Sequence, residues 1–160
     1  MKKRNVIKRM AAVGLGFMML VGMTACGDSY SSDLSAQELA ESVQGKVAIS
    51  DATNLRDNLV EDSYGADLSF LEDFYVLKSS EGVTPDEIAV FKVKDTGDLS
   101  KCTDAFKTRQ EYQKTNFESY KPDQMYKFDN VYTNTFGVYA VMVIADDTSD
   151  VEAAVEEALK

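Results

Sequence analysis

The stretch Val138-Tyr139-Ala140-Val141-Met142-Val143-Ile144-Ala145 decides the fold. Alternate residues of a strand point to opposite faces of its sheet, and this stretch is apolar at both sets of positions. A strand of this kind is typical of the interior of a sheet. We therefore predict a central strand over residues 138–145.

The segments on either side of this strand supply its neighbours. Residues 127–134 are predicted to form another strand, joined to the central one by a turn at 134–137. A helix is predicted to begin after Ser149, which forms a capping box with Glu152. Its apolar stripe follows helical spacing and consists of Val151, Ala154, Val155, Ala158 and Leu159.

Upstream, the pattern predicts a hairpin followed by a long helix. Strands are expected at 74–79 and 87–94, separated by a loop that contains Gly82 and Pro85. The long helix runs from Asp98 to about Ser119, and Pro122 forces its end.

Two more helices are predicted before the hairpin. Ser35 and Glu38 form a capping box for the first, which ends at Gly45. The second covers residues 53–64. The order α-α-β-β-α-β-β-α predicts an α+β fold, a two-layer sandwich in which helices pack on one face of an about four-stranded, mainly antiparallel sheet.

Three motifs resemble a known family. They are 86–92 (Asp-Glu-Ile-Ala-Val-Phe-Lys), the helix end 119–122 (Ser-Tyr-Lys-Pro) and 137–141 (Gly-Val-Tyr-Ala-Val). Together they are similar to the domain of unknown function numbered four-three-five-eight, a family of short bacterial lipoproteins. The resemblance spans about residues 34–160. It implies a lipoprotein with one compact domain, and it implies no activity and no catalytic residue.

The N-terminus is typical of a secretion signal. Five basic residues lie within the first ten, and residues 11–25 carry no charge. The run ends Met23-Thr24-Ala25-Cys26, which resembles the lipobox of bacterial lipoproteins; in that motif the cysteine is acylated and becomes the new N-terminus. An ordinary signal with a chance cysteine is the alternative. We expect residues 1–25 to be a removed signal, 26–33 a lipidated Cys26 with a flexible tether, and 34–160 one domain.

Charge excludes some partners. The signal holds five of the 17 basic residues, so 12 remain against 27 acidic ones, a formal charge of about −15. Such a charge disfavours nucleic acid, whose phosphates need cationic contacts.

The signal and the lipobox predict the location. We expect the protein to lie on the extracytoplasmic face of the cell membrane, where the lipid anchor at Cys26 holds it.

The residue types present exclude several kinds of chemistry. The chain has no histidine, which removes Ser-His-Asp and Cys-His nucleophiles and histidine metal sites. Cys102 is either a reactive thiol or, as its apolar neighbours favour, a small buried hydrophobe. Asp146, Asp147 and Asp150 could bind a hard cation, but we favour helix capping. No catalytic residue, metal or cofactor is predicted.

Arg109 is the one binding candidate. It falls near the apolar face of the long helix, while Glu87 begins a strand on the side of Ala89 and Phe91. We expect a partly buried Arg109–Glu87 pair; the alternative is an arginine that binds an anion in a pocket.

These observations favour a non-catalytic binding or interaction module, with an envelope protein as its expected partner. The alternatives are a small cell-envelope enzyme that uses carboxylates and a structural subunit of a membrane assembly. An aromatic cleft with close carboxylates would favour the enzyme, and a broad apolar patch would favour a protein partner.

Overall fold

The structure is a computed structural model of the chain, and it describes residues 29–160. The predicted signal and Cys26 lie outside the described residues. In chain order the elements are α1 (Ala36–Gln44), β1 (Ala52–Asn54), α2 (Asp57–Tyr64), β2 (Leu71–Ser79), β3 (Glu87–Val93), the 3-10 helix η1 (Thr96–Asp98), α3 (Leu99–Tyr120), the 3-10 helix η2 (Pro122–Asp129), β4 (Tyr132–Phe136), β5 (Tyr139–Ile144) and α4 (Val151–Leu159).

The sheet confirms the α+β class and the antiparallel pairing. Its order is β1-β2-β3-β5-β4, and every neighbouring pair is antiparallel. It has five strands instead of about four, because residues 52–54 pair with 77–79 as a short edge strand rather than starting a helix. The predicted strand at 138–145 is confirmed as interior, since β5 lies between β3 and β4.

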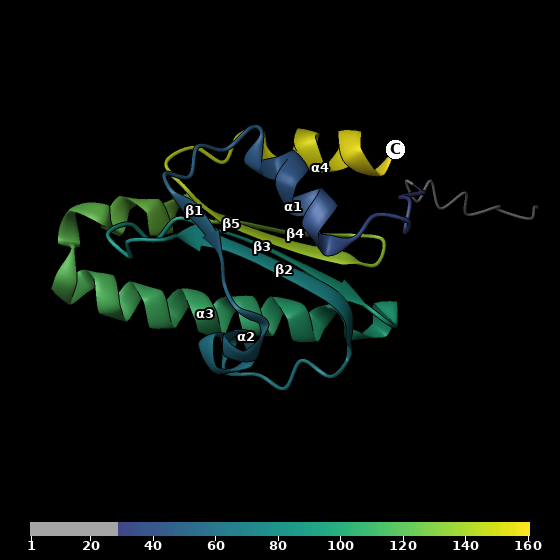
Figure 1. Ribbon diagram of the computed structural model, residues 1–160, viewed down its shortest axis with the longest axis horizontal. Coiled ribbons are helices and arrows are strands. Elements are labelled where there is room, and N and C mark those ends of the chain that lie inside the picture. Colours follow the sequence, from purple (N-terminus) through teal and green to yellow (C-terminus); the bar gives the residue numbers. More distant parts are fainter. Residues whose placement is uncertain (1–28) are drawn as a thin grey trace, which may run out of the picture.

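Helices cover both faces of the sheet, so the prediction of a two-layer sandwich with one covered face is wrong. Helices α1 and α4 lie on one face and α2 and α3 on the other (Figure 1). On β3, Ile88 and Val90 join the core under α1 and α4, while Ala89 and Phe91 join the core under α3. Two strands that are apolar on both sides need cover on both sides.

The prediction of a strand over residues 127–134 is only partly correct. Residues 122–129 form η2, and β4 begins at Tyr132. The two aromatic residues of the predicted strand are used separately: the Phe128 ring in η2 packs on Phe117, and Tyr132 begins β4. The turn between β4 and β5 accordingly lies at Gly137, whose φ of +56° is a left-handed value that suits glycine.

The two predicted capping boxes have opposite outcomes. At α1, Ser35 Oγ accepts from the Glu38 N–H, and Glu38 Oε2 accepts from the Ser35 N–H, so the box is confirmed. At α4 the cap is Asp150, without a side-chain cap bond, and the Ser149 N–H donates instead to Asp147 Oδ1. The predicted box of Ser149 with Glu152 is therefore wrong.

The domain begins before Leu34. The Tyr30 ring packs edge-on against Phe136 with centroids 5.3 Å apart, and the Ser31 N–H donates to the Leu159 carbonyl at 2.8 Å. Residues 30 and 31, predicted to belong to a flexible tether, are thus docked beside the β4–β5 turn.

Candidate functional site

The candidate site forms where β3 begins beside the second half of α3. Alternation along β3 places Glu87 on the same face as Ala89 and Phe91, toward α3. On α3, Arg109 and Gln113 are one turn apart and both face the sheet. These three side chains are almost fully buried, with 0, 8 and 6% of their surface exposed.

Glu87 is the hub of a closed hydrogen-bond network. Its Oε1 accepts from Tyr64 Oη at 2.7 Å and from Arg109 Nε at 3.0 Å. Its Oε2 accepts from Arg109 Nη2 at 2.6 Å and from Gln113 Nε2 at 2.7 Å. A carboxylate offers about four lone-pair sites, so these donors satisfy it. The predicted Arg109–Glu87 pair is confirmed.

The charges in this network are fixed by their contacts. Burial alone would lower the pKa of Arg109, but the Glu87 carboxylate raises it, so the pKa lies above its ordinary value and the guanidinium stays charged. Burial, followed by the charge of Glu87, raises the pKa of Tyr64 well above its ordinary value. Tyr64 therefore remains a hydroxyl donor to Glu87.

The preceding residue, Asp86, has its own buried cation. Lys127 Nζ lies 2.6 Å from Asp86 Oδ1 and 3.3 Å from Asp146 Oδ1. Burial acts to lower the pKa of Lys127, but its bonds to Asp86 and Asp146 raise it above the ordinary value. The Tyr126 hydroxyl and Lys127 lower the pKa of Asp146, whose side chain is mostly exposed. Both acids at the start of β3 are thus neutralised by partners.

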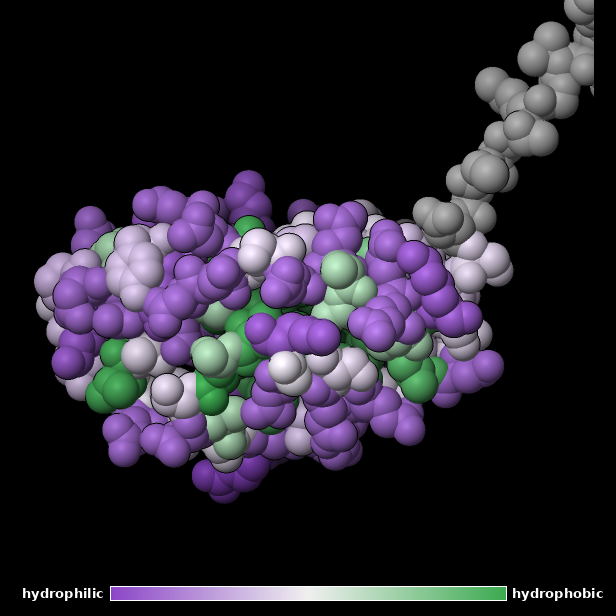
Figure 2. Space-filling model, turned by 90° about the horizontal axis from the view of Figure 1, so that it is seen from above, coloured by the Kyte–Doolittle hydropathy of each residue, from purple (hydrophilic) through white to green (hydrophobic). Residues whose placement is uncertain are grey.

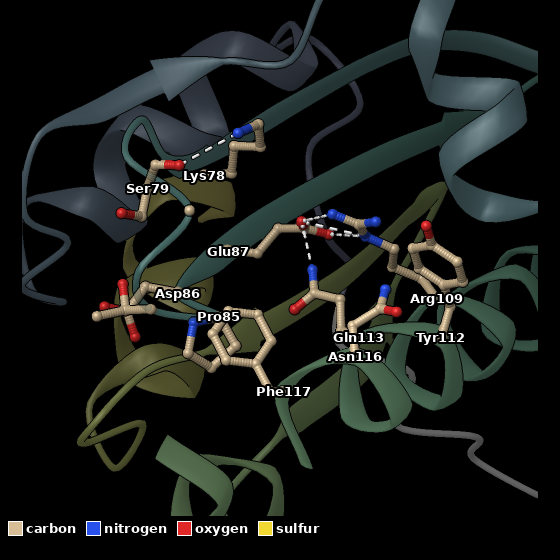
Figure 3. Close-up of a pocket in the computed structure, with 12 residues that line it drawn as sticks. Lys78, Ser79, Pro85, Asp86, Glu87, Arg109, Tyr112, Gln113, Asn116 and Phe117 are labelled. Atoms are coloured by element: carbon tan, nitrogen blue, oxygen red, sulfur yellow. Dashed lines mark hydrogen bonds and ion pairs between the residues drawn. The ribbon is translucent and has the colours of Figure 1, made fainter. Parts of the chain in front are cut away.

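A cleft of about 180 Å³ opens beside these two acids. One wall is the end of β2 with the 80–86 loop, and the other is the face of α3 from Arg109 to Phe117 (Figure 3). Among residues 29–160, three buried side-chain oxygens have no hydrogen-bond partner, and two of them, Thr84 Oγ1 and Gln113 Oε1, belong to residues that line this cleft. Orphaned buried polar atoms are uncommon in folded proteins and call for an explanation.

The other sequence candidates are placed differently. Cys102 is fully buried, and burial raises its pKa to about 12, which fits the apolar interpretation. Asp146 pairs with Lys127, and Asp147 accepts from the Ser149 N–H in the loop before α4. Asp150 stands at the N-cap of α4 but makes no side-chain cap bond, so the capping interpretation is wrong as far as these hydrogen bonds are concerned. Within residues 29–160, no three Cys, Asp or Glu side chains gather as metal ligands would. The lipid-attachment candidate Cys26 lies outside the described residues.

Sequence reasoning missed Gln113 as a network member and the whole Asp86–Lys127 pair. For Gln113 a signal existed, since an amide stands one turn after Arg109 on an otherwise apolar stripe. Asp86 and Lys127 are 41 residues apart, and no pattern links them before η2 is folded.

The comparison with known protein families gives one match. Residues 46–145 match a family described as a domain of unknown function, DUF4358. The chain belongs to this family. The resemblance drawn from the three motifs is thereby confirmed. No curated protein and no solved structure matches the chain.

The DUF4358 segment contains the candidate site and omits two helices. It includes all five strands, α2 and α3, and with them every residue that lines the cleft. Helices α1 and α4 lie outside it. Among the described residues, no helix is both long and apolar enough to cross a bilayer.

Proposed function

We propose that this DUF4358 protein is a lipid-anchored extracytoplasmic binding module that binds its ligand in the cleft between the 80–86 loop and α3. The anchor rests on sequence: a basic start, an uncharged run and the lipobox-like Met23-Thr24-Ala25-Cys26. Diacylation at Cys26 would supply a stable membrane anchor.

The docked N-terminus gives this anchor a geometric consequence. Only residues 27–29 separate Cys26 from docked Tyr30, and a chain of this length spans at most about 14 Å. The end with Tyr30 and the Gly137 turn would then face the membrane. The cleft lies at the other end of β3, because Lys92 pairs with Tyr139 near that turn whereas Glu87 pairs with Ile144 (Figure 1). The ligand would approach from the side away from the bilayer.

One observation carries the choice of binding over catalysis. Both acids of the cleft are paired with cations, Glu87 with Arg109 and Asp86 with Lys127, so neither presents an unpaired carboxylate to a substrate. The orphaned oxygens of Thr84 and Gln113 are hydrogen-bonding groups without a partner, which is what a ligand site provides.

A structural subunit is supported less well. Such a role, like the envelope-protein partner expected from the sequence, favours a broad exposed apolar patch. The face formed by α1 and α4 is mainly hydrophilic, with hydrophobic residues showing only between polar ones (Figure 2). Within residues 29–160, the exposed large hydrophobic residues lie apart in the sequence and are Leu59, Val83, Tyr112, Tyr120 and Tyr126.

Metabolic labelling with a tagged fatty acid tests the anchor. The wild type and Cys102→Ala should be labelled equally, because the Cys102 thiol is buried in the core. Cys26→Ala should lose the label. Equal labelling of Cys26→Ala would contradict the anchor.

Turnover assays test the binding role. The full-length protein in detergent should release no product from peptidoglycan, glycan or ester substrates, with or without divalent metal. Turnover that is lost in Asp86→Asn while the fold is kept would favour a carboxylate enzyme instead.

A further inference from the structure

The hydrogen-bonding groups that line the cleft beside Glu87 indicate what kind of ligand it binds. We propose that it takes one neutral, hydroxyl-bearing ring, a single sugar unit, with a ring hydroxyl that donates to Gln113 Oε1. This deepens the proposed function and rests on it.

Gln113 fixes the need for a donor on the ligand. Its Nε2 must face Glu87 Oε2, at 2.7 Å, because a carboxylate that accepts from Arg109 and Tyr64 has no proton to give. The amide orientation is therefore determined by chemistry, and Oε1 points away from Glu87 (Figure 3). This oxygen is buried and has no partner within residues 29–160. Only a donor group can satisfy it.

Arg109 and Thr84 supply the complementary groups. All three hydrogen bonds of Arg109 to Glu87 use Nε and Nη2, which leaves the N–H groups of Nη1 as donors. Thr84 Oγ1, the other buried oxygen without a partner in the described part of the chain, can donate or accept. A sugar ring carries several hydroxyl groups, each of which can donate or accept, so one ring can serve an acceptor and a donor at different points of the cleft.

The charges favour a neutral ligand. The charged residues that line the cleft are Lys78, Arg109, Asp86 and Glu87, whose formal charges cancel. An anion would set its oxygens against Gln113 Oε1 with no proton between them, which leaves buried acceptors unpaired. A cation would compete for Glu87 with donors that already satisfy it.

Shape and lining agree with a ring. The cleft holds about 180 Å³, below the roughly 300–1,000 Å³ of sites for drug-sized ligands, so it accommodates one small ring. Phe117 and Tyr112 line it from α3, and Asn116 adds an amide between them (Figure 3). Aromatic faces can pack against the C–H face of a sugar while the amides bond its hydroxyls.

Titration of the full-length, isotope-labelled protein in detergent tests this inference by NMR. The probes are glucose, galactose and N-acetylglucosamine as neutral sugars, glucuronic acid as a charged sugar, and acetamide as a small neutral amide. A neutral sugar should shift the Gln113 side-chain amide and the backbone amides of 82–87 and 109–117. Glucuronic acid should bind more weakly than its neutral counterpart glucose.

Thr84→Val separates ligand binding from folding. Valine keeps the shape and removes an oxygen that has no partner in the free protein, so the unfolding midpoint should stay equal or rise. Affinity for the sugar should fall about 3–10-fold, the worth of one hydrogen bond. The matched control Thr135→Val, on the exposed edge of β4, should change neither.

Each contrary outcome has a distinct meaning. No shift with any neutral sugar, or tighter binding of glucuronic acid, would overturn the sugar assignment. Shifts with acetamide alone would also overturn it while leaving the cleft as a binding site. Hydrolysis of a bound disaccharide, followed in the same spectra, would instead overturn the proposed non-catalytic function and leave the ligand class standing.

Discussion

The two faces of the sheet are built from the same strands but hold their helices in different ways. Toward α1 and α4 the buried side chains of β3 and β5 are hydrophobic, as in Ile88, Val90 and Val141. Toward α2 and α3 the same strands add one charged residue, Glu87, at the end where the cleft opens. The first interface is mainly hydrophobic packing, with two hydrogen bonds at the start of α1, from Tyr139 Oη to the Leu34 carbonyl and from the Ala36 N–H to Asp73 Oδ2. The second interface adds a buried charged network at one point.

This difference shows which of the two interfaces fixes the position of its helix on the sheet. Apolar packing tolerates side-chain exchange when volume is kept, whereas a buried carboxylate needs each of its donors in place. Helix α3 is therefore fixed in register against β3 by Arg109 and Gln113, and this register brings the cleft walls together. The family segment follows the same division, since it contains α3 and omits α1 and α4.

The largest expected effect tests whether the α3 face is closed. In Cys26→Ala protein, Cys102 is the only thiol, and its pKa of about 12 against an ordinary 9.0 reduces the thiolate fraction about 1,000-fold. A thiol reagent at pH 8 should react with Cys102 only after denaturant is added. Fast labelling of the native protein would show that this face opens.

The next effect breaks the directional bond. Arg109→Met leaves Glu87 buried without its cation and should lower the free energy of unfolding by about 3–5 kcal/mol. Urea denaturation followed by circular dichroism measures it, with exposed Lys107→Met on the same helix as control. The double variant Glu87→Leu/Arg109→Met should recover much of the loss. Equal stability of Arg109→Met and wild type would mean that the network does not hold α3.

The apolar face should respond in proportion to volume. Leu39→Ala on α1 removes a fully buried side chain and should cost about 2–5 kcal/mol. Gln37→Ala, exposed on the same helix, should stay within about 0.5 kcal/mol. In contrast to Arg109→Met, Leu39→Met should cost less than about 1.5 kcal/mol, because methionine keeps the volume. A larger loss would mean that this face is as specific as the other.

The capping box of α1 should contribute less. Ser35→Ala removes the acceptor of the Glu38 N–H and should cost about 1 kcal/mol. Ser32→Ala, an exposed serine just outside the helix, is the control and should change little. A loss as large as that of Leu39→Ala would show that the cap, not the packing, holds α1.

The smallest expected effect concerns Asp146, whose ion pair with Lys127 is exposed on the Asp146 side, unlike the buried pair of Glu87 with Arg109. Asp146 is mostly exposed, so Asp146→Asn should cost under about 1 kcal/mol at pH 7. Folding lowers the pKa of Asp146 from its ordinary 3.8, so its contribution is present above that pH and lost as the pH falls further. Unfolding curves of both proteins should converge at acidic pH. A difference that grows on acidification would contradict this sign.

The sequence predicted much of the fold because the signals were local. Pro122 sets the end of α3, the Ser35 box sets the start of α1, and the apolar run at 138–145 identifies the interior strand. Because this run is apolar on both sides, it also requires helices on both faces of the sheet. The predicted sandwich, with helices on one face only, was inconsistent with that requirement. The predicted strand over 127–134 is only partly right: residues 127–129 complete η2, where Phe128 packs on Phe117, and the strand begins at Tyr132.

Some contacts of the candidate site could also be predicted from local sequence signals, and others could not. Alternation and helical spacing were enough to predict the Arg109–Glu87 pair, because each residue's face could be derived from its own element. The Asp86–Lys127 pair, the contact of Tyr64 with Glu87 and the orphaned oxygens of Thr84 and Gln113 could not be derived.

By itself, the sequence determined most of the elements, the antiparallel class, the family resemblance and the side of β3 on which Glu87 lies. Only the tertiary structure decided which donors surround Glu87, that Tyr30 docks beside the Gly137 turn, and that a cleft opens next to two acids that are already neutralised. The physical reason is range. Propensity, capping and periodicity act within a few residues, whereas hydrogen-bond satisfaction depends on atoms that meet only when segments 23 to 41 residues apart pack together.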